Sequence, residues 1–330
     1  MNYTDIDVVI TWVNDKDPEW QKEKYEYVKD TVDDTNSNLR YRDWDNLQFF
    51  FRGICKNMPW VRKVHFVTWG HIPSWLDTSE PRLNIVKHTD FIPDEYLPTF
   101  NSNAIELNIH RIPGLAEQFI VFNDDMLTIH GTKPEDFFLN GKVLDMALVS
   151  PQPIYRNSIM NIELNNMKII NDYFGVSDIK KNIKNWTNIR KYGKNALRTM
   201  IFCKFQSIIG IFQPHIPYSF FKSTFDELWE KEEAVLDSTC KNKFRTTEDV
   251  NIWLMRSWQL LSGKFVPRSH RFGHLISASD FKSINYYLND AKCKMVCIND
   301  DDSVVDFEKT KEYVNNELIR LLPEKCSFEK

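Results

Sequence analysis

Two neighbouring carboxylates follow an apolar run near the middle of the chain. Asn123, Asp124 and Asp125 come directly after the segment FIVF at 119–122. Loops beyond the carboxyl ends of parallel strands are where α/β proteins bind their ligands. Two carboxylates there suit Mg²⁺ or Mn²⁺, which proteins hold through one or two carboxylates together with the phosphate oxygens of a substrate. Taken alone, an Asp-Asp pair after a strand is more often a solvated turn.

A second group of polar residues lies just before this strand. The segment SNAIELNIHRIPG puts Glu106 and His110 four residues apart on one face of an expected helix, with Arg111 beside them. An acid, a base and a phosphate-binding cation would then lie near the acidic strand end. A surface pair, with Arg111 in a salt bridge, explains the same residues, and their types alone do not decide between the two.

Further candidates lie in the last third of the chain. His215 follows a proline, and it is equally well explained as a packed core histidine. Arg245 precedes the residues TTED, which have the pattern of a helix start with a Thr cap and acids in its first turn. The planar guanidinium of Arg245 suits bidentate phosphate binding or a carboxylate partner. The run NDDD at 299–302 includes Asp300, but it lacks the glycine and the bidentate glutamate of a calcium loop.

The elements that must position these residues alternate between strand and helix. Strands are expected at 6–13, 61–69, 83–88 and 117–126, and helices at 43–57 and, with Ser102 as N-cap, at about 103–110. This order predicts an α/β fold with an open, mainly parallel sheet flanked by helices. We expect residues 1–149 to form the N-terminal part of a catalytic α/β domain, 150–210 a helical insertion or lid, and 211–330 a C-terminal helical part that completes the domain.

Composition excludes several classes of function. The chain has 42 Lys and Arg against 46 Asp and Glu, so its formal net charge of −4 offers no global reason to bind nucleic acid. It has no Gly-rich phosphate loop, no GxSxG elbow and no HExxH helix, which disfavours kinases, dehydrogenases, serine hydrolases and zincins. Its six cysteines show no CxxC or zinc-finger spacing and are expected to be reduced and structural.

The sequence also indicates where the protein works. The N-terminus carries acids where a signal peptide would be positive, and no apolar run approaches the ~18 residues of a spanning helix. We therefore expect a cytoplasmic protein whose contact with a membrane is at most peripheral. The basic stretch from Lys180 to Lys194 is a candidate for touching an anionic leaflet.

Three segments resemble, in order and spacing, the Stealth protein family. They are DVVITWVNDKDPEW at 7–20, RYRDWDNLQFFFRGICKNMPWVRKVHFVTWGHIPSWL at 40–76 and PTFNSNAIELNIHRIPGLAEQFIVFNDDM at 98–126. That family includes bacterial capsular and exopolysaccharide phosphotransferases and the catalytic subunit of the animal lysosomal-enzyme N-acetylglucosamine-1-phosphotransferase. The resemblance implies a nucleotide-sugar-transferase-like fold, and peripheral contact with the inner membrane or the capsule assembly machinery.

The reaction that the resemblance implies joins two sugars through a phosphate. A hydroxyl of an oligosaccharide or polysaccharide acceptor attacks the sugar-bearing phosphorus of a UDP-sugar donor, which forms a phosphodiester and releases UMP. Such a reaction needs a divalent cation and basic side chains on the diphosphate, and a base near the hydroxyl.

The resemblance also implies residue roles. By motif position, Glu106, Asp125, His215 and Arg245 correspond to catalytic residues. Asp124 and Asp125 are assigned to the metal with Asp300 as a candidate third ligand, and Arg111 and Arg245 to the phosphates. His215 is the preferred base because an imidazole titrates near the operating pH, with His110 and Glu106 in reserve.

The remaining assignments concern the donor nucleotide. The resemblance and the strand end assign Thr11, Trp12 and Asn14 to the uridine or its ribose, and Arg40 and Asp43 to the rest of the donor pocket. Trp12 is equally well explained as a core residue. Two alternatives also stay open: a metal-dependent glycosyltransferase that releases UDP, and a noncatalytic carbohydrate-binding protein of polysaccharide assembly.

Overall fold

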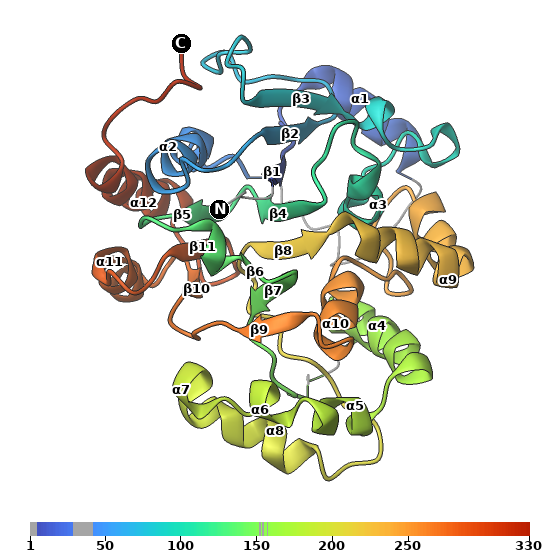
Figure 1. The fold of residues 1–330 in the computed structure, drawn as a ribbon. Helices are drawn as coiled ribbons and strands as arrows, with labels where there is room; N and C mark the ends of the chain where they lie inside the picture. The colour runs from blue at the N-terminus through green and yellow to red at the C-terminus, as the bar shows by residue number, and fades with distance from the viewer. Residues whose placement is uncertain (1–4, 29–41, 152, 154, 157) are drawn as a thin grey trace.

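A central five-stranded sheet organises the protein. The structure, a computed structural model, describes residues 5–28, 42–151, 153, 155–156 and 158–330. The strand order is β3-β2-β1-β4-β8 (Figure 1). The first four strands are parallel and β8 runs antiparallel to β4, which confirms the predicted open, mainly parallel α/β fold. The strands are β1 (Ile6–Thr11), β2 (Val64–Thr68), β3 (Leu83–Lys87), β4 (Gln118–Asn123) and β8 (Tyr218–Phe221).

Helices cover both faces of this sheet because its central strands are apolar on both sides. Successive strand residues point to opposite faces. In β4, Phe122 packs against Phe50 of α2 (Leu47–Asn57), with ring centroids 5.3 Å apart. Phe119, an odd number of residues away, packs against Phe225 of α9 (Lys222–Lys241) at 5.6 Å on the other face. The continuous apolar run of each strand thus follows from its burial between two helix layers.

Two smaller sheets flank the central one. The first has the order β10-β11-β5 and joins β10 (Gly273–Ser277) and β11 (Met295–Asn299), which are parallel, to β5 (Met126–Thr128), which is antiparallel. The second has the order β6-β7-β9, from β6 (Phe138–Leu139), β7 (Lys142–Asp145) and β9 (Phe265–Pro267). Because β5 follows β4 after a two-residue turn, the first of these sheets meets the central sheet where β4 ends.

The other helices complete the layers. They are α1 (Pro18–Tyr27), α3 (Ser102–Asn108) with the following 3-10 turn η5 (Ile109–Arg111), α10 (Trp253–Leu261), α11 (Phe281–Asn289) and α12 (Phe307–Leu321). In Figure 1, α11 and α12 lie on the left with α2, and α9 lies on the right beside α3. The C-terminal segment is tied to α2 by Arg52, which binds Glu329 through Nε at 2.7 Å and Nη2 at 2.8 Å.

Residues 150–210 form the expected helices. These are α4 (Met160–Tyr173), α5 (Val176–Lys181), α6 (Ile183–Trp186), α7 (Ile189–Tyr192) and α8 (Ala196–Phe202). Helices α5 to α8 lie together at the end of the molecule opposite β3 (Figure 1). One hydrophobic cluster includes Val8, Ile170, Trp258 and Leu318, so all three predicted parts share a core. Their boundaries, and a lid role for the insertion, stay predictions.

Three local expectations were wrong. Asn101, not Ser102, caps α3, because its side chain accepts the backbone N–H of Asn103 at 3.0 Å. The residues TTED at 246–249 form a turn, and α10 begins only at Trp253. The C-terminal part is not purely helical, since it supplies strands β8 to β11.

Candidate active site

The carboxyl ends of the parallel strands gather the loops that carry the predicted site. Thr11, the last residue of β1, is paired with Asn123, the last residue of β4. The loop after Thr11 and the turn of Asp124 and Asp125 therefore begin side by side. The loop after β2 joins them, because the backbone N–H of Asn14 donates to His71 Nε2 at 2.7 Å.

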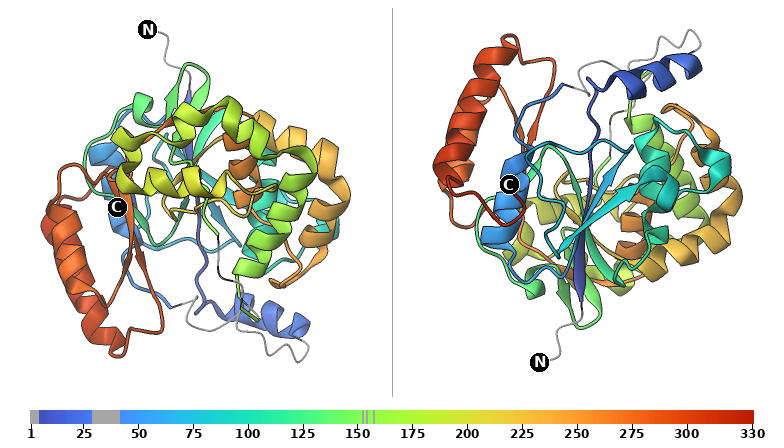
Figure 2. Two further views of the ribbon diagram at one scale, coloured as in Figure 1. Left: turned by 90° about the horizontal axis from the view of Figure 1, so that it is seen from below. Right: turned by 90° about the horizontal axis from the view of Figure 1, so that it is seen from above.

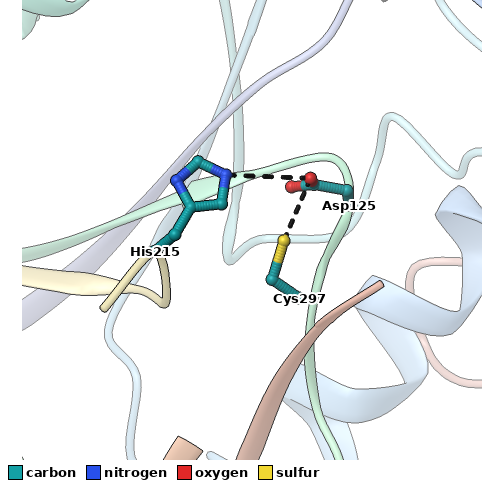
Figure 3. Close-up of side chains that lie close together, drawn as sticks. All are labelled: Asp125, His215 and Cys297. Carbon is teal, nitrogen blue, oxygen red and sulfur yellow. Dashed lines mark hydrogen bonds and ion pairs between the residues drawn. The ribbon is translucent and has the colours of Figure 1, made fainter. Parts of the chain in front are cut away.

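Asp125 lies at the centre of a small polar cluster (Figure 3). Its Oδ2 is 4.0 Å from Nε2 of His215 and accepts a hydrogen bond from the Cys297 thiol at 3.0 Å. The ligand atoms of these three residues all lie within 4.8 Å of one another. The other carboxylate oxygen, Oδ1, is buried and has no hydrogen-bond partner. Burial and Asp125 raise the pKa of Cys297 well above its usual value, so this thiol stays protonated and acts as a donor.

Strand pairing holds Asp125 in place. Cys297 of β11 is paired with Met126 of β5, and the backbone N–H of Ile298 donates to the carbonyl oxygen of Asp125 at 3.0 Å. The turn between β4 and β5 is therefore closed by a strand from more than 170 residues further along the chain. The backbone of this turn does not depend on the carboxylate of Asp125.

His215 is held in an uncommon backbone conformation. Its φ is +48°, in the left-handed region that costs a non-glycine residue roughly 1 kcal/mol or more. Its backbone N–H donates to the hydroxyl of Tyr218 at 3.1 Å. The preceding segment is bound by the fully buried Arg256, whose Nη1 donates to Phe212 O and Gln213 Oε1, both at 2.8 Å. These contacts aim the His215 ring at Asp125.

Arg256 is in turn anchored by a buried carboxylate. Its Nε and Nη2 donate to the two oxygens of Asp145 at 2.7 and 2.9 Å. A buried guanidinium is tolerated only when its donors are satisfied. Asp145 ends β7, so this pair fixes the His215 segment to the β6-β7-β9 sheet.

Further carboxylates gather at the same edge. The Asp124 side chain is exposed at the surface, but many protein atoms lie around its carboxylate. The resulting desolvation, together with the charge of the adjacent Asp125, raises the pKa of Asp124 to about 7. Asp43 adds to this rise. Burial also raises the pKa of Asp15, again with a contribution from Asp43, and Asp15 Oδ1 is buried without a partner. Each of these carboxylates makes ionisation of its neighbours less favourable, and a bound cation would stabilise their charged forms.

These residues fit a hard divalent cation. Asp124 and Asp125 offer carboxylate oxygens, and the unpaired Oδ1 of Asp125 lacks the partner that a buried oxygen requires. Carboxylates suit Mg²⁺ and Mn²⁺, whereas an imidazole is a softer ligand. Cys297 is unsuited as a ligand while its proton is donated to Asp125. The predicted pair of metal-binding aspartates is therefore chemically consistent with the structure.

Glu106 and Arg245 lie next to each other beside this edge. Arg245 binds Ser102 Oγ through Nε at 2.8 Å and also through Nη2. Burial raises the pKa of Glu106 to about 7, and the charge of Arg245 opposes that rise. Arg245 follows Phe244, which stacks on Phe100 at 5.4 Å, and Phe100 in turn packs on Trp20 of α1. Helix α1 directly follows the Asn14 loop. Glu106 and Arg245 therefore lie toward the same end of the sheet as Asn14.

The structure does not bring His110 and Arg111 to Asp125. Both belong to η5, close to the start of β4 and thus at the opposite edge of the sheet. His110 is buried 4.0 Å from Asp226 at the start of α9, and burial lowers its pKa to about 3. Arg111 lies over the ring of Trp229 at 4.6 Å.

The remaining predicted residues are Asp300, Trp12 and Arg40. Asp300 lies 3.6 Å from Arg42, and burial raises its pKa. Trp12 stacks on Phe66 and meets the His71 ring edge-on at 5.2 Å, so its half-buried ring packs on the core. Arg40 lies outside the described residues.

Some site residues were not predicted. Cys297 was expected to be structural, and Asp15 and Arg256 were not singled out at all. Asp15 could have been noticed, because it follows Asn14 in the turn after β1. Nothing in the local sequence marks Cys297 or Arg256, whose roles depend on pairing with Asp125 and Asp145 far away in the chain.

Comparisons with known proteins agree with the sequence motifs. Residues 4–31 match the family model of Stealth protein conserved region 1, and residues 40–146 match that of conserved region 2. The capsular polysaccharide phosphotransferase WcwK of Streptococcus pneumoniae is 43% identical, with 100% of this chain and 99% of the relative covered. The receptor polysaccharide phosphotransferase WefC of Streptococcus oralis is 39% identical, with 98% and 99% covered. The exopolysaccharide phosphotransferase cps2G of Lactiplantibacillus plantarum is 34% identical, with 99% and 96% covered.

Solved structures overlap less closely. The galactosyltransferase LgtC, in complex with donor and acceptor sugar analogues, aligns over 94% of this chain and 95% of its own, at 8% identity and a TM-score of 0.39.

Proposed function

The chain belongs to the Stealth family, and on that premise we propose that it is a capsular or exopolysaccharide phosphotransferase. It moves a sugar 1-phosphate from a UDP-sugar to a hydroxyl of an oligosaccharide or polysaccharide acceptor. The hydroxyl oxygen bonds to the phosphorus that bears the sugar, and the bond from that phosphorus to the bridging oxygen breaks. The products are a phosphodiester and UMP.

The observation that carries this proposal is the Asp125 and His215 pair beside further carboxylates. A diphosphate needs a cation, and the attacking hydroxyl needs a base within hydrogen-bond reach. The pair offers both functions 4.0 Å apart at the carboxyl edge of the sheet, where α/β folds bind their ligands.

His215 is the base in this proposal. Its side chain is 29% exposed, so a substrate hydroxyl can reach it, whereas the His110 side chain is only 6% exposed. The acceptor proton passes to His215 as the new oxygen–phosphorus bond forms. Tyr218 and Arg256 act as positioning residues, because they hold the segment that carries the ring.

Asp124 and Asp125 hold Mg²⁺ or Mn²⁺ in this proposal. When bound, the cation neutralises charge on the diphosphate. Arg245 contributes a second positive charge for a phosphate group, and it lies beside the Glu106 carboxyl. Thr11, Asn14 and Asp43 border the donor site. Asp300, whose two carboxylate oxygens are buried without a hydrogen-bond partner, is a candidate third ligand of the cation. Arg111 is not part of the site.

The proposed reaction belongs in the cytoplasm, with peripheral contact at the inner face of the membrane. Among the residues that the structure describes, no helix combines the length and the apolar character needed to cross a bilayer.

Exchange of Asp125 tests this proposal. Asp125→Asn keeps an oxygen that can accept from Cys297 but removes the charge. We expect kcat to fall by about 100-fold or more, since a metal that stabilises transition-state charge is worth several kcal/mol. Asp226→Asn, the same exchange at an exposed carboxylate near the opposite edge, is the matched control and should keep normal kcat. Turnover is followed by nucleotide release at varied Mg²⁺ and Mn²⁺. Normal turnover of Asp125→Asn with an unchanged metal requirement would rule out the proposed metal site.

A further inference from the structure

The helical insertion presents an apolar surface to solvent. Ile189, Leu197, Met200, Ile201 and Phe205, here called the apolar ridge, are each 51 to 61% exposed. Leu197, Met200 and Ile201 have the i, i+3, i+4 spacing of one helix face, and Phe205 adds an exposed ring in the turn that follows α8. The ridge therefore has a defined direction on the molecule.

The opposite face of α8 explains why these side chains point outward. Ala196 and Thr199 are fully buried, and Ala196 packs with Leu148 and Tyr192 in a small apolar cluster. The Thr199 hydroxyl accepts the backbone N–H of Val149 at 3.1 Å. Helix α8 is thus anchored by its small residues, while its large apolar residues remain outside.

Basic residues surround the ridge. Residues 180–204 contain eight Lys and Arg and no Asp or Glu, whereas the whole chain has a net charge of −4. The rest of the chain therefore carries −12. Seven of the eight are exposed: Lys180, Lys181, Lys184, Arg190, Lys191, Lys194 and Lys204. Apart from Lys181, which pairs with Asp178 at 2.8 Å, none of these seven forms a salt bridge with a residue that the structure describes.

We propose that the apolar ridge and its basic border form a binding site for an anionic phospholipid surface. Apolar side chains flanked by lysines can enter the headgroup region while the ammonium groups meet lipid phosphates. A symmetric dimer through this surface would bring the two sets of positive charges together and be repelled. Nucleic acid phosphates would satisfy the lysines but would leave the large apolar side chains in water. An anionic leaflet satisfies both.

The insertion that carries the ridge joins the main body close to His215. The insertion leaves the main body after Val149 and returns at Ile211, which bridges to Val149 and is four residues before His215. Seen from below, α5 to α8 spread over the face nearest the viewer (Figure 2, left). This inference deepens the peripheral localisation in the proposed function, since it names the contact surface.

Vesicle sedimentation tests the site without turnover. The full chain is mixed with vesicles of phosphatidylcholine alone or with added phosphatidylglycerol, and bound protein is quantified. We expect binding to the anionic vesicles only, weakened by salt. The double exchange Lys191→Glu with Lys194→Glu should weaken it by about tenfold or more, because each basic residue near such a surface contributes roughly 1 kcal/mol. Leu197→Ser with Ile201→Ser should weaken binding as well, since less apolar surface is buried.

Matched controls lie on elements outside the insertion. Lys87→Glu with Lys325→Glu makes the same change of charge at two exposed lysines, and Val305→Ser changes an apolar side chain that is 97% exposed. Both should bind anionic vesicles like the parent chain. Failure of the parent chain to bind anionic vesicles would overturn the proposal. So would equal binding by the ridge variants, or dimerisation through the ridge in place of lipid binding. Turnover on a soluble acceptor, measured in parallel, reports on the proposed reaction separately, because it needs no lipid.

Discussion

Removal of the Tyr218 hydroxyl should slow catalysis without touching a catalytic residue. This hydroxyl accepts the backbone N–H of His215 at 3.1 Å and so stabilises a left-handed φ of +48°. Tyr218→Phe keeps the buried ring, which is 4% exposed and packs near Phe220. The N–H of His215 then loses its hydrogen-bond partner. The left-handed backbone conformation at His215 still carries its conformational free-energy cost.

The structure sets the size of the effect. Loss of a hydrogen-bond partner costs about 1–3 kcal/mol, with the upper end reserved for groups that water cannot reach. The His215 contact is only partly buried, so about 1–2 kcal/mol is expected. If this free energy favours other conformations of the His215 segment, kcat falls by roughly 5- to 30-fold, because 1.4 kcal/mol corresponds to a factor of about ten. The KM for the donor should change little, since Tyr218 does not border the donor loops.

The assay compares kcat and KM for the parent chain, Tyr218→Phe and Tyr173→Phe. The Tyr173 hydroxyl donates to Glu232 at 2.7 Å on the surface, so its loss removes one tyrosine hydrogen bond far from His215. We expect normal kinetics for Tyr173→Phe and similar melting temperatures for all three proteins. Parental kcat for Tyr218→Phe would refute the idea that this hydroxyl positions His215.

Two further predictions concern a phosphate contact and the pH dependence of stability. Arg245→Lys keeps the charge but loses the planar guanidinium that binds Ser102. We expect kcat/KM to fall by about 10- to 150-fold, the equivalent of 1.5–3 kcal/mol for a hydrogen bond to a charged group. Steady-state kinetics measure this change, and an unchanged kcat/KM would show that Arg245 has a structural role only. Burial raises the pKa of Glu163 from 4.5 to about 7. Between pH 4.5 and about pH 7, the folded state therefore keeps a proton that the unfolded state has lost. The free energy of unfolding falls as the pH rises through this range. Glu163→Gln has no such proton to lose: denaturant unfolding should show equal stability at pH 4 and an advantage of up to about 3 kcal/mol for the variant at pH 8. A constant difference across this range would show that Glu163 does not titrate as described.

Local patterns were sufficient to predict the sheet and its acidic edge. The apolar runs ending at Thr11 and Asn123 predict buried parallel strands, and parallel strands bring their carboxyl ends to one edge. Asp124, Asp125 and Asn14 followed from that rule. The pairing of Cys297 with Asp125 could not be predicted in this way, because it joins residues 172 positions apart through a sheet whose strand order has no local signal.

His110 shows the limit of helix periodicity. A spacing of four residues does place Glu106 and His110 on one side of a helix, but it also moves the second residue about 6 Å along the axis. Here that step leads away from the catalytic edge, and His110 is buried beside Phe225 and Trp229.

The residues TTED fail as a helix start for a related reason. Thr246 donates to the Asp249 carboxylate through both its backbone N–H and its hydroxyl, but that carboxylate also accepts from Asn101, Asn103 and Asn242. These bonds to distant asparagines hold the segment as a turn.

Identification of the nucleotide released during turnover tests the central claim most directly. The purified chain is incubated with a panel of UDP-sugars, an oligosaccharide acceptor and Mg²⁺ or Mn²⁺, and the products are separated by chromatography. Transfer of a sugar 1-phosphate predicts UMP in equal amount with a phosphodiester-linked product. Release of UDP with a glycosidic product would instead identify a glycosyltransferase and contradict the account.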